Sequence, residues 1–130
     1  LMNLQKIARR AKKVGIDIYL YMNEPRAQPQ EFFELRPQMA GVNRDGFTTM
    51  CTSDEQVRNW MEESLTHVFT EVPELGGVFT ITASENLTNC ASHGGKDQCP
   101  RCSKRPYEDI IVDSLAPRNE SKPDAEAESP

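Results

Sequence analysis

The chain has 130 residues, of which 37% are hydrophobic and 27% are charged, and its formal net charge at pH 7 is −5. This length suits one small domain or a segment of a larger one. The negative charge gives no electrostatic basis for binding nucleic acid or an anionic membrane surface, so no nucleic-acid partner is expected. No apolar stretch approaches the roughly 20 residues of a membrane-spanning helix, so no membrane span is expected. Both a periplasmic or secreted location and a cytoplasmic location are consistent with the sequence.

The first part of the chain predicts a helix and then a buried strand. Apolar residues recur at helical spacing between residues 2 and 14, and Gly15 stands where a helix commonly ends. The stretch "GIDIYLYM" (residues 15–22) is short and nearly continuously apolar, which is typical of a buried strand in a parallel sheet. Residues 24–52 contain three prolines and are predicted to form a long irregular connection with a short helix near residues 31–35.

A second helix and strand follow. Ser53 is the predicted N-cap of a helix over residues 53–72, and its apolar stripe, which includes Trp60 and Phe69, is predicted to face the core. The stretch "GGVFTITA" (residues 76–83) reads as a second short buried strand.

The remainder predicts a polar loop over residues 84–103, a final helix over residues 107–115 and a disordered polar tail over residues 116–130. The alternation of helices and strands predicts an α/β fold with a parallel sheet. Two strands are too few for a parallel sheet covered on both faces, so residues 1–115 are interpreted as part of a larger barrel domain.

Each predicted strand ends next to a glutamate, Glu24 after the first and Glu85 after the second. Sites in α/β folds lie at the carboxyl ends of parallel strands, and burial there raises the pKa of a carboxylic acid toward the range of a general acid. Two acids on neighbouring strands are the pair that glycoside hydrolysis needs. The alternative is a structural role, in which each glutamate caps a helix or pairs with an arginine such as Arg26.

Glu85 is the stronger candidate because Asn86, Thr88 and Asn89 follow it and supply hydrogen-bonding groups suited to sugar hydroxyls. The same loop holds the pattern Cys90-x-x-His93-x5-Cys99-x-x-Cys102.

Three thiolates and one imidazole form a soft, tetrahedral ligand set that suits zinc. Because Cys90, His93, Cys99 and Cys102 would fill all four positions, the pattern predicts a closed structural zinc site. The alternatives are a Cys99–Cys102 or Cys90–Cys99 disulfide, or buried free thiols. Cys51 has no neighbouring cysteine in the sequence and is interpreted as a small buried residue.

Two stretches resemble glycoside hydrolase family 20 hexosaminidases. They are "GIDIYLYMNEPRAQPQEFFELRPQMAG" and "VRNWMEESLTHVFTEVPELGGVFTITASENLTNC". Their order of strand, loop, helix and strand is similar to the third- and fourth-strand segment of that family's (β/α)8 TIM barrel. The resemblance implies a partial barrel with long loops after its strands, and it places Glu85 at the glutamate that protonates the glycosidic oxygen. Ser84 stands where the family has an aspartate.

The sequence therefore predicts a fragment of a glycoside hydrolase that acts on oligosaccharides or glycans, including those with N-acetylhexosamine. Glu85 is the expected general acid/base, and the fragment alone is expected to be inactive. The expected substrate contacts are Asn23, Glu24, Arg26, Asn86 and Asn89. The alternatives are a small zinc-stabilised binding module and a barrel that binds glycans without cleaving them.

Overall fold

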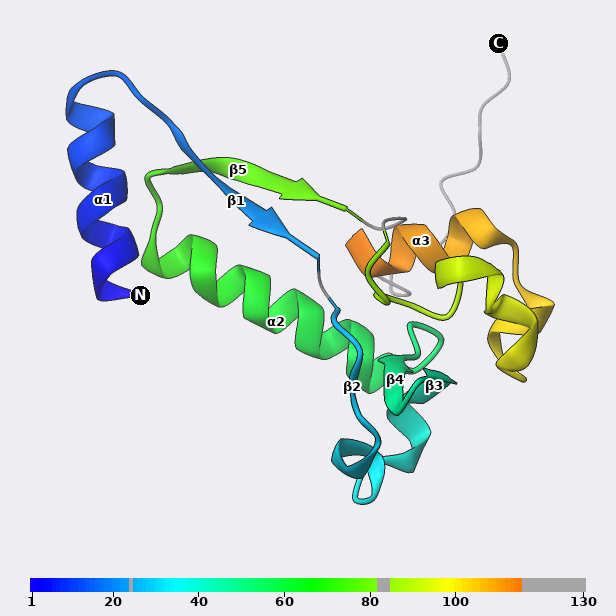
Figure 1. Cartoon of the computed structure of the whole chain (residues 1–130). Helices are drawn as coiled ribbons and strands as arrows, with labels where there is room; N and C mark the ends of the chain where they lie inside the picture. Colours follow the sequence, from blue (N-terminus) through cyan, green and yellow to red (C-terminus); the bar gives the residue numbers. More distant parts are fainter. Residues whose placement is uncertain (24, 82–84, 116–130) are drawn as a thin grey trace, which may run out of the picture.

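The computed structural model describes residues 1–23, 25–81 and 85–115. Glu24, Ser84 and the predicted polar tail lie outside these residues. Three helices and five strands are found within them (Figure 1). The helices are α1 (Met2–Lys13), α2 (Glu55–Glu71) and α3 (Tyr107–Leu115), and the strands are β1 (Ile18–Met22), β2 (Gln28–Pro29), β3 (Ala40–Arg44), β4 (Phe47–Met50) and β5 (Leu75–Thr80).

Strands β1 and β5 are parallel neighbours, as the sequence predicts, with α2 in the connection between them. Leu20 pairs with Val78 and Tyr21 with Phe79. Helices α1 and α2 pack on one face of this sheet, where Ala8, Val72 and Leu75 form a buried cluster. Burying a side chain such as Val or Leu contributes about 1.5–3 kcal/mol, so this cluster holds the helices against the strands.

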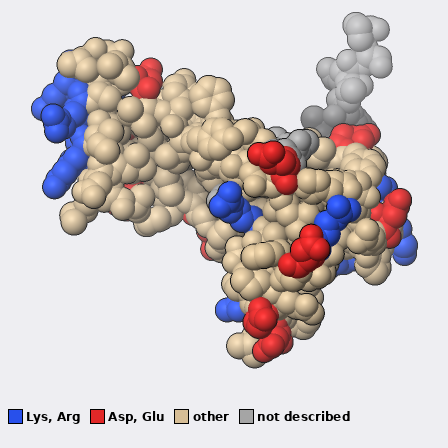
Figure 2. All heavy atoms as spheres, in the orientation of Figure 1, with Lys and Arg blue, Asp and Glu red and all other residues tan. Residues whose placement is uncertain are grey.

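The opposite face of the β1–β5 sheet is aromatic and open. Tyr19, Tyr21 and Phe79 are 49%, 67% and 63% exposed, and the rings of Tyr19 and Phe79 lie 5.3 Å apart. Gly76 and Gly77 allow the ring of Tyr19 to lie directly against the strand, because an added Cβ at either position would overlap this ring where it now stands. Figure 2 shows few charged side chains over this part of the molecule, between the basic edge at α1 and the mixed charges of the other half.

Helix α2 differs from its prediction at two residues. Asp54, not Ser53, is the N-cap, because its carboxylate accepts hydrogen bonds from the backbone N–H groups of Gln56 and Val57. Trp60 was expected in the core but is 43% exposed, whereas Met61 on the same helix is buried.

Residues 25–52 are more regular than predicted. Strands β2, β4 and β3 form an antiparallel sheet in that order, and short 3₁₀-helices span Gln30–Phe33 and Pro37–Met39. The β3–β4 hairpin turns through Asp45 and Gly46, both at positive φ (51° and 84°), which is a two-residue type I′ turn. An Asp-Gly pair is a usual sequence for such a turn, so this part of the sequence does carry a local signal for the hairpin.

The described residues form a mixed α/β structure with one two-stranded parallel sheet and one three-stranded antiparallel sheet, and no closed barrel is found among them. The partial barrel therefore stays a prediction. Within the same residues, none of the helices has both the length and the apolar character needed to cross a bilayer.

The hairpin turn gives a first prediction. Substitution of Gly46 by Ala forces a Cβ into the left-handed region and destabilises the hairpin by about 1 kcal/mol. Asp45→Asn is the matched control, because asparagine tolerates positive φ and leaves stability nearly unchanged. Urea unfolding measures both variants, and equal stability of Gly46→Ala and the parent chain would contradict the turn assignment.

Candidate metal centre and adjoining groove

Four cysteines from three separate segments converge in the interior of the molecule. Cys51 follows β4, Cys90 lies in the loop after β5, and Cys99 and Cys102 lie between that loop and α3. All four are buried, and their Sγ atoms lie within 4.8 Å of one another. This group can therefore hold a metal ion.

The distances between the sulfurs fit a metal site better than a disulfide. The Sγ atom of Cys51 lies 3.7 Å from that of Cys99 and 3.5 Å from that of Cys102. A tetrahedral zinc ion with Zn–S bonds of about 2.3 Å separates its sulfurs by about 3.8 Å. A disulfide requires about 2.05 Å, and all four cysteines are free thiols in the structure.

The local backbone explains how the sulfurs are brought together. The backbone N–H of Cys51 donates to the Met39 carbonyl (2.8 Å), which fixes the exit of the hairpin. The backbone N–H of Ser103 donates to the Cys99 carbonyl (2.8 Å) and closes the Cys-Pro-Arg-Cys turn. Gly41 on β3 is also required, because an added Cβ would overlap the hydroxyl of Thr49 and the sulfur of Cys90.

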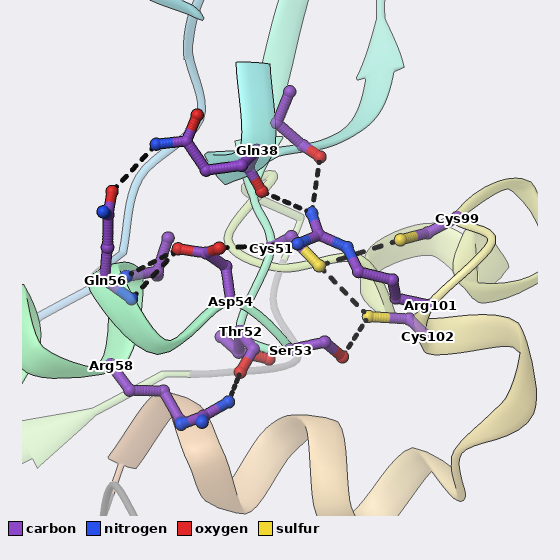
Figure 3. Close-up of polar contacts among 12 residues, drawn as sticks. Gln38, Cys51, Thr52, Ser53, Asp54, Gln56, Arg58, Cys99, Arg101 and Cys102 are labelled. Atoms are coloured by element: carbon purple, nitrogen blue, oxygen red, sulfur yellow. Dashed lines mark hydrogen bonds and ion pairs between the residues drawn. The ribbon is translucent and has the colours of Figure 1, made fainter. Parts of the chain in front are cut away.

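Arg101, within the Cys-x-x-Cys turn, fastens this turn to the rest of the molecule. Its guanidinium donates to the backbone carbonyls of Gln38 (2.6 Å) and Ala40 (3.3 Å) and lies 3.5 Å from the Asp54 carboxylate (Figure 3). The turn is thus tied to the start of β3 and to the N-cap of α2. These contacts position Cys102 opposite Cys51.

The close sulfurs change one another's acidity. Hydrogen bonds from the thiols of Cys51 and Cys90 lower the pKa of Cys102, with a further contribution from the hydroxyl of Ser53. The pKa of Cys51 is raised to about 12, mainly because its thiol is hydrogen-bonded to Cys102. The lowered pKa of Cys102 favours its thiolate, the form that ligates metals.

The structure differs from the predicted ligand set at one position. Cys51 lies with the other three cysteines, whereas His93 is exposed and is not part of this group. The Nε2 atom of His93 lies 2.8 Å from the backbone carbonyl oxygen of Glu85, and Arg44 donates to the His93 carbonyl (2.9 Å). Cys51 was missed because its approach to Cys90 depends on the hairpin that was not predicted.

A second feature of the structure is an open groove of about 540 Å³. Its lining residues come from the loops after β1 and β5 and from the β3–β4 hairpin. They include Arg26, Arg44, Asp45, Phe47, Glu85, Asn86 and His93. Acidic and basic side chains are interspersed over this half of the molecule (Figure 2). The structure thus brings together three predicted site residues, Glu85, Arg26 and Asn86, at the carboxyl end of the parallel strands.

Two other predicted contacts lie elsewhere. Asn89 is 1% exposed: its Oδ1 accepts a hydrogen bond from the Ala91 backbone (2.9 Å) and its Nδ2 donates to Ser114 (3.3 Å). Its amide therefore holds the loop together. Asn23 is half-buried outside the groove lining, and its buried Oδ1 has no hydrogen-bond partner within the described part of the chain. Glu24 lies outside the described residues.

Comparisons with protein-family models, with curated proteins and with solved structures find no match to this chain. The site is therefore interpreted from its own geometry.

The cluster predicts which residues hold a metal. Cys51→Ser is expected to weaken metal binding by more than about 100-fold. Mutation of residues that only hydrogen-bond to metal ligands already costs up to about 100-fold, and Cys51 would itself be a ligand. His93→Ala, the matched control, leaves the affinity unchanged because its ring lies outside the cluster. Competition with a chromophoric chelator measures both variants. Loss of binding in His93→Ala with normal binding in Cys51→Ser would restore the ligand set predicted from the sequence.

Proposed function

We propose that Cys51, Cys90, Cys99 and Cys102 bind one structural zinc ion that braces the loops at the carboxyl end of β1 and β5. The observation that carries this proposal is the close approach of four buried sulfurs, all within 4.8 Å of one another. The separations of 3.7 and 3.5 Å from Cys51 to Cys99 and Cys102 are near the value for a zinc tetrahedron. Thiolates are soft ligands that favour zinc over magnesium or calcium. Four protein ligands leave no position for water or substrate, so the role is structural.

The zinc ion would join three segments that share few other buried apolar side chains with one another. The buried cluster around it consists of the four cysteines with Val42 and Ile110. This cluster is separate from the one that joins α1 and α2 to the parallel sheet. Removal of zinc is therefore expected to loosen one half of the molecule more than the other.

Zinc removal is the test. The purified chain is expected to contain about one zinc per molecule. After chelation, hydrogen exchange rises in residues 38–54 and 85–105, while α1 and the N-terminal half of β1 keep their protection. Re-addition of zinc restores the original pattern. Absence of bound zinc, or an exchange pattern unaffected by chelation, would contradict the proposal.

A second candidate function, glycoside hydrolysis, is favoured by the groove. Glu85, Arg26 and Asn86 line it together with Phe47, whose half-exposed ring can stack on a sugar. The volume is in the range of small-molecule sites, and the position at the carboxyl ends of parallel strands is where α/β folds build active sites.

In this candidate function, Glu85 protonates the glycosidic oxygen of an oligosaccharide, and Arg26 and Asn86 bind sugar hydroxyls. The aromatic face of β1 and β5 supports a place for these strands in a larger barrel, because helices cover one face and Tyr19, Tyr21 and Phe79 would fill the barrel interior. A barrel that binds glycans without cleaving them is the non-catalytic alternative.

Glu85→Gln tests the catalytic role in the full natural protein that contains these residues. Hydrolysis of aryl glycosides, N-acetylhexosaminides among them, is expected to fall by about 10²- to 10⁴-fold. The loss is smaller for a nitrophenyl leaving group that needs no protonation. Glu62→Gln on the exposed side of α2 is the control and keeps full activity. Unchanged turnover in Glu85→Gln would exclude this residue as the acid, and glycan binding without turnover would favour the non-catalytic alternative.

A further inference from the structure

Two hydroxyl groups lie directly against the cysteine cluster. The Oγ1 atom of Thr49 is 3.6 Å from the sulfur of Cys90, and the Oγ atom of Ser53 is 3.2 Å from the sulfur of Cys102. Figure 3 shows the second contact, with Ser53 directed toward Cys102 at the side of the cluster away from Gln38. The two hydroxyls reach different sulfurs from opposite ends of the same short segment.

The hydrogen of the Thr49 hydroxyl is available for Cys90. Thr49 is fully buried, and its oxygen already accepts a hydrogen bond from the backbone N–H of Val42 (2.8 Å). Because a hydroxyl carries one hydrogen and accepts through its lone pairs, this arrangement leaves the O–H bond free to point at the sulfur.

Ser53 is oriented in the same way by an arginine. The Nη1 atom of Arg105 donates to the Ser53 oxygen (2.8 Å), and the guanidinium of Arg105 forms an ion pair with the buried carboxylate of Asp113. The O–H of Ser53 is thereby directed at Cys102. The positive charge of Arg105 lies one hydroxyl group away from that sulfur.

A metal centre of this composition needs such donors. A divalent ion with four thiolates carries a net charge of −2, and burying this charge is costly unless hydrogen-bond donors and positive groups surround it. Mutation of residues that hydrogen-bond to the metal ligands typically lowers metal affinity by about 10- to 100-fold.

We propose that Thr49 and Ser53 are positioning residues of the metal centre, which donate O–H···S hydrogen bonds to Cys90 and Cys102. This inference rests on the proposed zinc site and deepens it. Arg105 acts through Ser53, because it fixes the direction of the hydroxyl and offsets part of the negative charge of the thiolates. The hydroxyls hold the two sulfurs at the angles that a tetrahedral ion requires.

Removal of each hydroxyl tests the proposal on the whole chain. Thr49→Val preserves shape and Ser53→Ala preserves backbone, and each is expected to lower zinc affinity by about 10-fold or more in competition with a chromophoric chelator. In the cobalt-substituted protein, each variant shifts the sulfur-to-cobalt charge-transfer band to lower energy, since a sulfur without its hydrogen bond is more easily oxidised. Thr49→Ser and Ser53→Thr keep the hydroxyl and restore both properties.

Thr52→Val is the matched control. Thr52 lies between Cys51 and Ser53 and is fully buried, but its hydroxyl donates to the backbone carbonyl of Ile110 (3.3 Å) and not to a sulfur. The Thr52→Val variant loses a buried hydrogen bond that does not involve a sulfur. Its stability is therefore expected to fall, while its zinc affinity and cobalt spectrum stay those of the parent chain.

The outcomes separate the two proposals. If the parent chain binds no zinc, the proposed function fails and this inference fails with it. If the parent chain binds zinc and both Thr49→Val and Ser53→Ala match its affinity and cobalt spectrum, only the role of the hydroxyls is overturned. An equal loss of affinity in Thr52→Val would also overturn it, because the effect would then be structural. Should Thr49→Val not fold, Ser53→Ala with its Ser53→Thr rescue decides.

Discussion

The approach of four buried sulfurs is the constraint on which one half of this molecule depends. The cysteines belong to segments separated by up to 51 positions in the chain, and they form most of one of the two buried clusters in that half. The other cluster consists of Phe33, Met39, Met50 and Val57. Cysteine is a small side chain, so the cysteine cluster removes little apolar surface from water. A bound metal ion would add to the free energy of folding of this half, since structural zinc contributes about 10–16 kcal/mol in zinc-finger peptides.

The same constraint shapes the neighbouring groove. Cys51 ends the hairpin that supplies Arg44 and Phe47, and Cys90 follows the loop that supplies Glu85 and Asn86. Both walls of the groove are therefore anchored at one cluster. A backbone hydrogen bond from Ala27 to Leu87 (3.0 Å) joins the loops after the two parallel strands. An ion at the cluster would limit changes in the separation between the hairpin and the loop after β5.

The local sequence patterns predicted the helices and the two parallel strands, whose formation depends mainly on neighbouring residues in the chain. The apolar periodicity predicted α2, and the short apolar runs predicted β1 and β5. Trp60 is exposed although it lies on that periodic stripe, because the elements that pack on α2 leave this side of it uncovered. The N-cap is Asp54 and not the predicted Ser53, because the Asp54 carboxylate accepts the backbone hydrogen bonds while the Ser53 hydroxyl contacts Cys102 and Arg105.

The cysteine cluster was predicted for three of its four residues, because Cys90, Cys99 and Cys102 lie close in sequence. Cys51 approaches the other three only because the β3–β4 hairpin folds back toward them, and sequence spacing does not predict such a tertiary contact. His93 was assigned in its place because it lies near the other three in sequence. The burial of Asn89 could not be predicted from the local sequence either, because its hydrogen-bond partner Ser114 belongs to α3.

X-ray absorption at the zinc edge of the purified chain tests the central claim most directly, because it reports which atoms surround the ion. Four sulfur neighbours at about 2.3 Å, with no imidazole signal, are the predicted result. A shell of three sulfurs and one nitrogen would place His93 in the site and contradict the Cys51 assignment. A shell of oxygen and nitrogen atoms alone would show that zinc binds outside the cluster and would contradict the account as a whole.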